Sequence, residues 1–266
     1  MNAMNLIDVI TLGVVEGITE FLPVSSTGHM ILTATLLKLE NTEFLKSFQV
    51  AIQVGAMFAI ILLYFKRLFS GWAIYQRLFV AFLPTATVGF VMYKLIKKFL
   101  FSPVVVSISL ILGGILLISL NRWIEESPAE YKDLEFMPLK NAFWIGMMQC
   151  LAMIPGVSRA GATIVGGILN GCNKRQATEF SFLLAIPTML AATAYDLLKN
   201  AEAIDQQGLL FLGVGGLTAF LSAWVAVKVF LNIVTRYGFA GFGYYRIFIG
   251  ATFLVLLYGM NLQLAT

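Results

Sequence analysis

The chain has 266 residues, of which 59% are hydrophobic and 12% are charged, with a mean hydropathy of +0.86. Soluble domains carry about 25% charged residues, so this composition excludes a soluble globular protein and indicates an integral membrane protein. The net charge of +4 does not indicate nucleic-acid binding, because the basic residues lie between apolar runs rather than along one stripe.

In chain order, the apolar segments predict six complete membrane spans and two interrupted ones. A helix needs about 20 apolar residues to cross the bilayer, and this predicts spans at 44–65, 78–99, 103–121, 177–198, 208–230 and 243–262. Segments 6–37 and 140–172 are also apolar, but FLPVSSTG and IPGVSRAG interrupt them with Pro, Gly and Ser. Irregular backbone at membrane depth occurs where protein or a watery cavity surrounds it. We therefore expect two broken or re-entrant segments that line a cavity.

Charged residues between the spans bear on orientation. No Lys or Arg precedes Lys38, so residues 1–37 are expected to belong to the mature protein rather than to a cleaved signal. Basic loops favour placing one end of the protein in the cytoplasm, opposite the acidic 196–205 loop; their residues are Lys66, Arg67, Arg77, Lys174, Arg175, Lys228 and Arg236. Lys94, Lys97 and Lys98 would then lie outside the cytoplasm, against the rule that basic loops face the cytoplasm. Charge alone therefore does not fix the orientation.

The two cysteines, Cys150 and Cys172, lie far apart in apolar surroundings. They lack the paired spacing of a zinc site. We expect both to be buried, unpaired thiols without a redox role.

The two interrupted segments match each other at an offset of 133 residues. GVVEGITEFLPVSSTG (13–28) then falls on GMMQCLAMIPGVSRAG (146–161), which pairs Ser25 with Ser158 and Glu16 with Gln149. We predict one membrane domain, 1–266, built from repeat 1–133 with re-entrant motif 13–30 and repeat 134–266 with re-entrant motif 146–163. Three intervening spans would invert the second repeat. The predicted fold is therefore an all-α polytopic membrane protein with an inverted-topology repeat around a central site.

Glu16 and Glu20 are four residues apart, so a helix places them on one face. Two carboxylates in a membrane segment without a nearby Lys or Arg need a cation or a basic group from elsewhere in the fold. They are candidate ligands for Mg²⁺ or Ca²⁺. The alternative is a helix start at the interface that leaves both carboxylates solvated, which is weaker for Glu20 beside the break.

Three consecutive hydroxyls, Ser25, Ser26 and Thr27, follow the break. Ser25 or Ser26 is expected to cap a second helix, whose free N–H groups form an anion site. Ser26 and His29 are three residues apart and can share a helical face, as a hydroxyl and the base that takes its proton. The alternative for the only histidine is a structural or proton-relay role.

The second broken segment, PGVSRAGAT (155–163), supplies a cation. Arg159 is the only basic residue between Lys140 and Lys174, and a guanidinium binds phosphate in a bidentate way. Ser158 is a candidate helix cap and Gly156 permits close backbone approach. An inverted repeat would bring Arg159 to the same site as the first motif, and this set of groups suits phosphoryl transfer.

EGITEFLPVSSTGH, PGVSRAGAT and SFLLAIPTMLAATAYDLLK (181–199) closely resemble the undecaprenyl-diphosphate phosphatase family, also called the bacitracin-resistance proteins, and the likeness covers nearly the whole chain. The resemblance implies hydrolysis of a C55 isoprenyl diphosphate to the monophosphate carrier used for peptidoglycan and other envelope polymers. It further implies a multi-pass enzyme of the bacterial inner membrane that depends on a divalent metal and opens to the periplasm.

Carried over by motif position, the resemblance implies that Glu16 and Glu20 hold the metal and the diphosphate. Glu20, Ser26, His29 and Arg159 would be the catalytic residues, with Ser26 or His29 as nucleophile or acid–base and Arg159 as the phosphate clamp. Further phosphate contacts are expected from Ser25, Thr27, Gly156, Ser158 and Thr163. The family commonly has a serine after the arginine, where this chain has Ala160, so no role of that hydroxyl applies here.

The mechanism expected from the sequence is attack by Ser26 on the terminal phosphorus while His29 accepts its proton. Attack by His29, or by a water activated by Glu20, would use the same residues. A lipid flippase or secondary transporter is the rival class, because such proteins also build midplane sites from broken helices. An intramembrane serine protease is disfavoured, because a peptide substrate gives the carboxylates and Arg159 no purpose. A polyprenyl diphosphate and membrane lipids are the expected partners; the choice of metal, the chain length, lipid translocation and homo-oligomerisation stay open.

Overall fold

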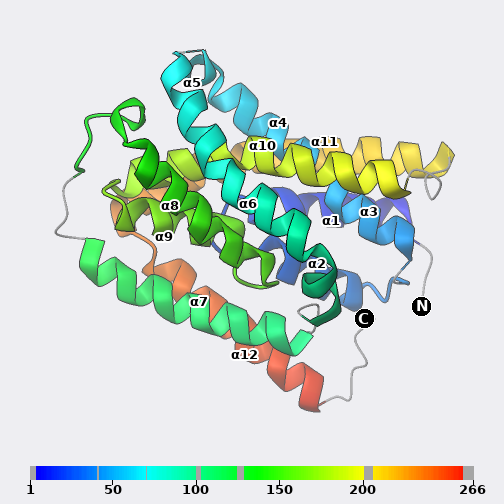
Figure 1. Cartoon of the computed structure of the whole chain (residues 1–266). Coiled ribbons are helices and arrows are strands. Elements are labelled where there is room, and N and C mark those ends of the chain that lie inside the picture. Colours follow the sequence, from blue (N-terminus) through cyan, green and yellow to red (C-terminus); the bar gives the residue numbers. More distant parts are fainter. Residues whose placement is uncertain are drawn as a thin grey trace.

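A computed structural model describes residues 4–40, 42–69, 71–99, 103–124, 129–200 and 206–259. These residues form α-helices and short 3₁₀ turns, with no extended strand among them, and the long helices lie side by side (Figure 1). The α-helices are α1 (Leu6–Thr19), α2 (Ser26–Leu36), α3 (Glu43–Ala51), α4 (Gln53–Leu63), α5 (Phe65–Leu68), α6 (Trp72–Phe99), α7 (Pro103–Ile124), α8 (Leu139–Gln149), α9 (Arg159–Leu169), α10 (Lys174–Asn200), α11 (Gln206–Tyr237) and α12 (Ala240–Gly259).

All six predicted spans are confirmed as helices long and apolar enough to cross a membrane. They are the consecutive pair α3 and α4, followed by α6, α7, α10, α11 and α12. The second span begins at Trp72, six residues before the predicted start at 78. Arg77 fits inside this helix because its guanidinium donates to the carbonyls of Ala73 at 2.8 Å and Met137 at 2.9 Å. The protein is an all-α polytopic membrane protein.

Both predicted interruptions are present. Asn5 and Asp8 form a capping box at the start of α1, and α1 ends at Thr19, four residues before Pro23. In the second segment α8 ends at Gln149 and a 3₁₀ turn (Cys150–Met153) leads into the Pro155 loop. Proline has no N–H to donate and disfavours helix in the residue before it, so each helix stops ahead of its proline.

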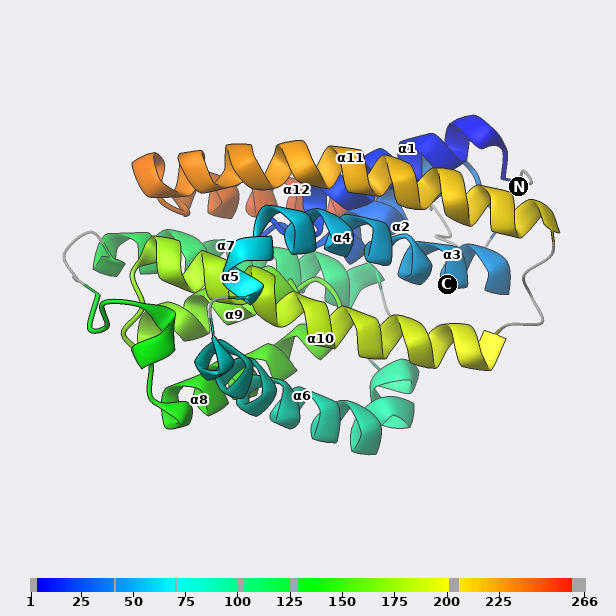
Figure 2. The same ribbon diagram turned by 90° about the horizontal axis from the view of Figure 1, so that it is seen from above.

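The two broken segments approach the middle of the protein from opposite ends. Helices α1 and α2 lie toward the end that holds the N-terminus, whereas α8 and α9 lie toward the other end (Figures 1 and 2). Helices α2 and α9 each have 11 residues and begin 133 positions apart, and their N-caps, Ser25 and Ser158, both have positive φ, at 70° and 74°. These features agree with an inverted repeat, and the division into 1–133 and 134–266 stays a prediction.

Glycines allow the helices around the site to approach closely. A Cβ at Gly17 on α1 would lie 2.1 Å from the Ser222 hydroxyl of α11, and one at Gly146 on α8 would lie 2.1 Å from the Ala81 carbonyl of α6. Small residues take this role in membrane interfaces, where association depends on close packing rather than on a hydrophobic driving force. Each broken segment therefore lies flush against a complete span.

The end of the protein that holds α5 carries Lys66 and Arg67 and is called the basic end below. The Arg67 guanidinium pairs with Asp133 and, at 2.9 Å, with Glu179 at the start of α10. The last turns of α11 point to the same end (Figure 2) and carry Arg236. Lys94, Lys97 and Lys98 lie in the part of α6 whose side chains the structure does not describe, and Glu202 and Asp205 lie outside the described residues.

Both cysteines are free thiols, as predicted. Cys172 is buried, and burial together with nearby Glu130 raises the pKa of its thiol to about 12. Cys150 is only partly buried, because it begins the turn at the second break rather than packing inside a helix bundle.

Candidate active site

Glu20 joins the two broken segments. It follows the last residue of α1 as its C-cap and is 8% exposed. The Ser26 hydroxyl, at the start of α2, donates to Glu20 Oε2 at 2.5 Å, and Arg159 Nη2, at the start of α9, donates to Glu20 Oε1 at 3.1 Å. The carboxylate of Glu20 thus contacts a serine hydroxyl and a cation from opposite ends of the fold.

Arg159 is fixed by three neighbours besides Glu20. Its Nη1 donates to the Ser181 carbonyl at 3.0 Å, its Nη2 lies 3.8 Å from the sulfur of Met189, and its guanidinium carbon lies 5.6 Å from the centre of the Phe21 ring. Its Nε is buried and has no hydrogen-bond partner in the described part of the chain. A buried donor without an acceptor is costly, so this atom is suited to receive an anionic oxygen from a ligand.

Glu16 has an unmatched acceptor atom, whereas Arg159 has an unmatched donor. Glu16 is 1% exposed, its carboxyl interacts with that of Glu20, and its Oε1 is buried with no hydrogen-bond partner among the described residues. Two carboxylates with substrate oxygens and water are the ligand set typical of Mg²⁺. Among the described residues, no group of three His, Cys, Asp or Glu side chains is placed to hold a metal ion, so a cation at Glu16 and Glu20 would take its other ligands from substrate and solvent.

His29 has partners other than Ser26. Its Nδ1 lies 2.8 Å from the Ser25 carbonyl and its Nε2 lies 2.7 Å from the Tyr245 hydroxyl. Because a carbonyl only accepts, Nδ1 carries a proton. In the neutral form of the ring, Nε2 would accept a hydrogen bond from the Tyr245 hydroxyl. The expected transfer from Ser26 to His29 is therefore not the pairing in this structure, where Ser26 donates to Glu20.

Two of the candidate phosphate contacts are helix caps. Ser25 and Ser158 are the buried N-caps of α2 and α9, and the Ser158 hydroxyl accepts from the Gly161 N–H at 3.1 Å. The Ser25 side chain makes no capping hydrogen bond, so the first turn of α2 keeps free N–H groups suited to an anion. Thr27, in that turn, is exposed.

Thr163 and Gly156, two further candidate phosphate contacts, pack against neighbouring helices. Thr163 is fully buried and donates to the Ser181 hydroxyl at 2.6 Å, which ties α9 to α10 beside the carbonyl that holds Arg159. Gly156 has φ +94°, and a Cβ there would lie 2.5 Å from the Val106 carbonyl of α7. Only glycine fits this turn, as the close approach predicted at Gly156 requires.

Two residues of α12 reach the site without having been predicted. Tyr245 binds His29 through its hydroxyl, and its ring is parallel to the imidazole with centroids 5.5 Å apart. Arg246 is 1% exposed and donates to the carbonyls of Pro23 and Gly156 in the two breaks. Arg246 had a signal, because it is the only charge in the apolar run 243–262; nothing in the sequence marks Tyr245.

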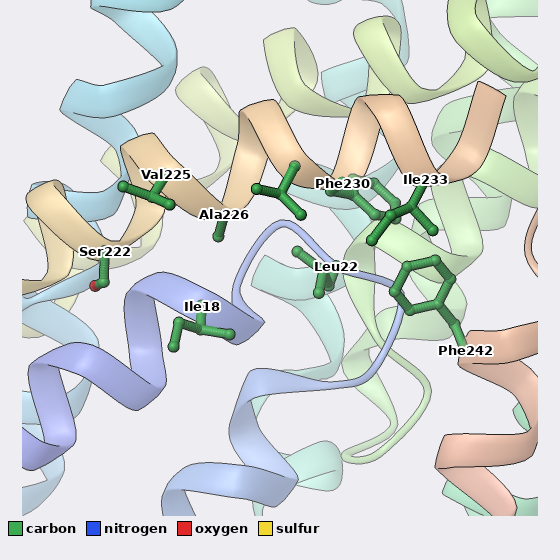
Figure 3. A pocket seen from close by; sticks show the side chains of 9 residues that line it. Ile18, Leu22, Ser222, Val225, Ala226, Phe230, Ile233 and Phe242 are labelled. Atoms are coloured by element: carbon green, nitrogen blue, oxygen red, sulfur yellow. The ribbon is translucent and has the colours of Figure 1, made fainter. Parts of the chain in front are cut away.

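An apolar groove of about 400 Å³ lies beside the first break. Ile18 and Leu22, two residues either side of Glu20, form one wall (Figure 3). The opposite walls come from α11 and α12, and the remaining lining residues are Ser222, Val225, Ala226, Val229, Phe230, Ile233 and Phe242. The groove is suited to a hydrocarbon chain.

Most of the chain is similar to known proteins of one family. Residues 9–252 match the family described as bacitracin resistance protein BacA. The chain belongs to this family. It is 48% identical over 262 residues to an undecaprenyl-diphosphatase of Bdellovibrio bacteriovorus, covering 98% of this chain and 100% of that protein. It is 49% identical over 245 residues to an undecaprenyl-diphosphatase of Aquifex aeolicus, covering 92% and 95% of the two chains. The family membership predicted from the two motifs is confirmed.

Proposed function

We propose that this protein hydrolyses undecaprenyl diphosphate to undecaprenyl phosphate and inorganic phosphate, which recycles the lipid carrier for envelope polymers and confers bacitracin resistance. The observation that carries the proposal is the pair of unmatched atoms around Glu20, Arg159 Nε as a donor and Glu16 Oε1 as an acceptor. A diphosphate bound with a divalent cation would satisfy both. The names of the relatives give independent support.

The geometry favours Ser26 as nucleophile and Glu20 as its base, because these groups share a hydrogen bond of 2.5 Å. Ser26 Oγ would bond to the terminal phosphorus as Glu20 takes its proton. The bond from that phosphorus to the bridging oxygen would break and release undecaprenyl phosphate. Water would then hydrolyse the phosphoserine, with Glu20 assisting. Arg159 and the N–H groups of α2 would stabilise the charge on the phosphoryl oxygens.

A divalent cation, Mg²⁺ or Ca²⁺, is part of the proposal. When bound, it would neutralise charge on the diphosphate oxygens. Glu16 and Glu20 would hold it, and the buried, unmatched Oε1 of Glu16 supports this assignment.

The deciding experiment measures phosphate release from a long-chain prenyl diphosphate by purified protein, with Mg²⁺ or with chelator. Wild type should release phosphate only with the metal, and Ser26→Ala and Arg159→Ala should abolish release. A lipid transporter would release none under any condition. Rapid-quench mass spectrometry should find phosphate on Ser26; phosphate on His29, or on no residue, would contradict the nucleophile assigned here.

We assign the apolar groove to the first isoprene units of the same substrate. Ile18 and Leu22, which line the groove, lie two residues before and after Glu20 in the chain, and the lining is almost entirely hydrocarbon. A head group bound at Glu20 would therefore direct its tail between α1, α11 and α12. The occupant is the isoprenyl tail rather than a bilayer acyl chain, because only the tail is covalently attached to the diphosphate.

Filling the groove should discriminate by chain length. Ala226→Trp should raise KM for a C55 diphosphate about 10-fold, a loss typical of removing apolar contacts, and should leave a short, soluble prenyl diphosphate much less affected. Leu217→Trp is the matched control, since Leu217 lies on α11, is 60% exposed and does not line the groove. Equal effects on the KM of both substrates would show that the isoprenyl tail does not bind in this groove.

We further infer that the protein lies in the bacterial inner membrane with its basic end in the cytoplasm and its site open to the periplasm. Lys66 and Arg67 lie at the basic end, and Glu43 begins α3 near the end that holds the N-terminus (Figure 2). Cysteines introduced at the exposed positions 43 and 66, in a chain lacking Cys150 and Cys172, test this in intact cells. An impermeant maleimide should label position 43 alone; labelling of 66 alone would invert the orientation.

A further inference from the structure

Arg246 is a buried cation that has no acidic partner among the residues that the structure describes. It lies on α12, a membrane span, and is 1% exposed. A guanidinium has five N–H groups, and all five are matched here by backbone carbonyls. The acceptors are Leu110 at 3.3 Å and Ser109 at 3.2 Å on α7, Pro23 at 3.0 Å in the first break, and Gly156 at 2.7 Å and Val157 at 3.0 Å in the second.

We propose that Arg246 is the positioning residue that holds the two breaks together as one phosphate site. The carbonyls that it binds in the breaks immediately precede the caps of α2 and α9: Val157 comes one residue before Ser158, and Pro23 two residues before Ser25. Both serines have positive φ, which is unfavourable for residues with a side chain and persists only where the surroundings impose it. Arg246 supplies that constraint to both broken segments at once.

The contact also orients a donor. In a planar trans peptide the carbonyl of one residue and the N–H of the next point in opposite directions. With the Val157 carbonyl on Arg246, the Ser158 N–H points away from the guanidinium. No residue that the structure describes accepts a hydrogen bond from it. This N–H begins the helix whose first residue is Arg159, so Arg246 sets the direction of the phosphate-binding start of α9.

Gly113 on α7 makes room for this guanidinium. A Cβ at Gly113 would lie 2.2 Å from Arg246 Nη2 and 2.7 Å from Cζ, and five hydrogen bonds prevent the guanidinium from moving aside. Positions 113 and 246 are 133 residues apart, the offset that relates the two motifs. The space between α7 and α12 therefore holds one guanidinium, supplied by the second half, and a glycine in the first half.

Hydrogen exchange tests the positioning role without reference to activity. In Arg246→Lys, Arg246→Met and Gly113→Ala proteins, exchange should speed up about 10-fold or more in residues 20–28 and 154–161 together, as local opening becomes easier, and should not change in α11. Gly241→Ala is the matched control on α12, where an added Cβ meets open space. Unchanged exchange in either break, or equal acceleration throughout the chain, would overturn the proposal.

A kinetic test rests on the proposed phosphatase function. In monodisperse protein, kcat should fall about 100-fold in Arg246→Lys and Arg246→Met, as for a misplacement near 1 Å, while KM changes little because the tail still binds. Lysine retains the charge but cannot bind five carbonyls in the same geometry. If Arg246→Lys had the kcat of wild type, the guanidinium would not be what positions the two breaks. If wild type itself releases no phosphate, the proposed function fails and hydrogen exchange still decides the role of Arg246.

Discussion

Glu20 accepts a hydrogen bond from Arg159, 139 residues further along the chain, at 3.1 Å in a buried environment. The pair connects the end of α1 to the start of α9, and it brings the carboxylate beside Ser26 into contact with the cation of the second motif. A charge-assisted bond of this kind fixes both partners in orientation. The site exists only when the two broken segments meet.

Replacing Glu20 with Gln should therefore remove the base for Ser26 while keeping the side chain's shape. We expect kcat to fall about 100- to 10,000-fold, the range for losing a general base. Phosphate release at saturating Mg²⁺ is the measurement. Glu43→Gln is the matched control, since Glu43 lies in an exposed pair with Lys46; activity retained in Glu20→Gln would exclude Glu20 as the base.

Glu16→Gln should weaken the proposed cation site. The amide keeps the size of the side chain but loses the charge, so the Mg²⁺ concentration for half-maximal activity should rise about 10- to 100-fold. A metal titration of phosphate release measures this, with Asp8→Asn on the same helix as control. An unchanged titration with reduced kcat would assign Glu16 to the substrate instead.

Tyr245→Phe should produce a smaller defect. It removes one hydrogen bond to His29 Nε2 but keeps the ring stacked on the imidazole. A bond of this kind is worth about 1 kcal/mol, so kcat/KM should fall about fivefold. Tyr244→Phe, whose side chain is 64% exposed, is the control and should have no effect. Loss of all activity in Tyr245→Phe would require a direct role for the hydroxyl in the reaction.

The sequence predicted the elements better than their partners. Membrane spans and breaks follow from apolar length and from proline, which act locally, and both were confirmed. The structure pairs Ser26 with Glu20 rather than with His29. Helical spacing allows Ser26 to face His29, but it cannot reveal that Ser26 binds Glu20 and that His29 binds the Ser25 carbonyl. Arg246 was missed because its role depends on carbonyls that are distant in sequence, and a lone arginine in a span does not say which backbone it contacts.

Cys172 should resist alkylation in the folded protein. Its pKa of about 12 keeps the thiol neutral at pH 8, and the thiolate is the reactive form. Because an unfolded thiol titrates near pH 8.5, the folded protein keeps this proton between that pH and pH 12, and the contribution of Cys172 to stability falls as the pH rises through this window. Peptide mapping after maleimide treatment should find Cys150 modified and Cys172 unmodified, and both modified in denaturant. Rapid labelling of folded Cys172 would contradict its burial.

Gly55→Ala should destabilise the helix packing that supports the site. A Cβ at Gly55 on α4 would lie 2.0 Å from the Gly216 carbonyl of α11. Helix α11 also packs against α1 and forms one wall of the groove. Overpacking of a close interface costs about 1–3 kcal/mol, so the melting temperature in detergent should fall by several degrees. Gly213→Ala on α11 is the control, because an added Cβ there meets nothing within 4 Å. Equal melting temperatures for the two variants would mean that α4 and α11 separate without cost, and the backbone contact at Gly55 would then not hold α11 in place against α1.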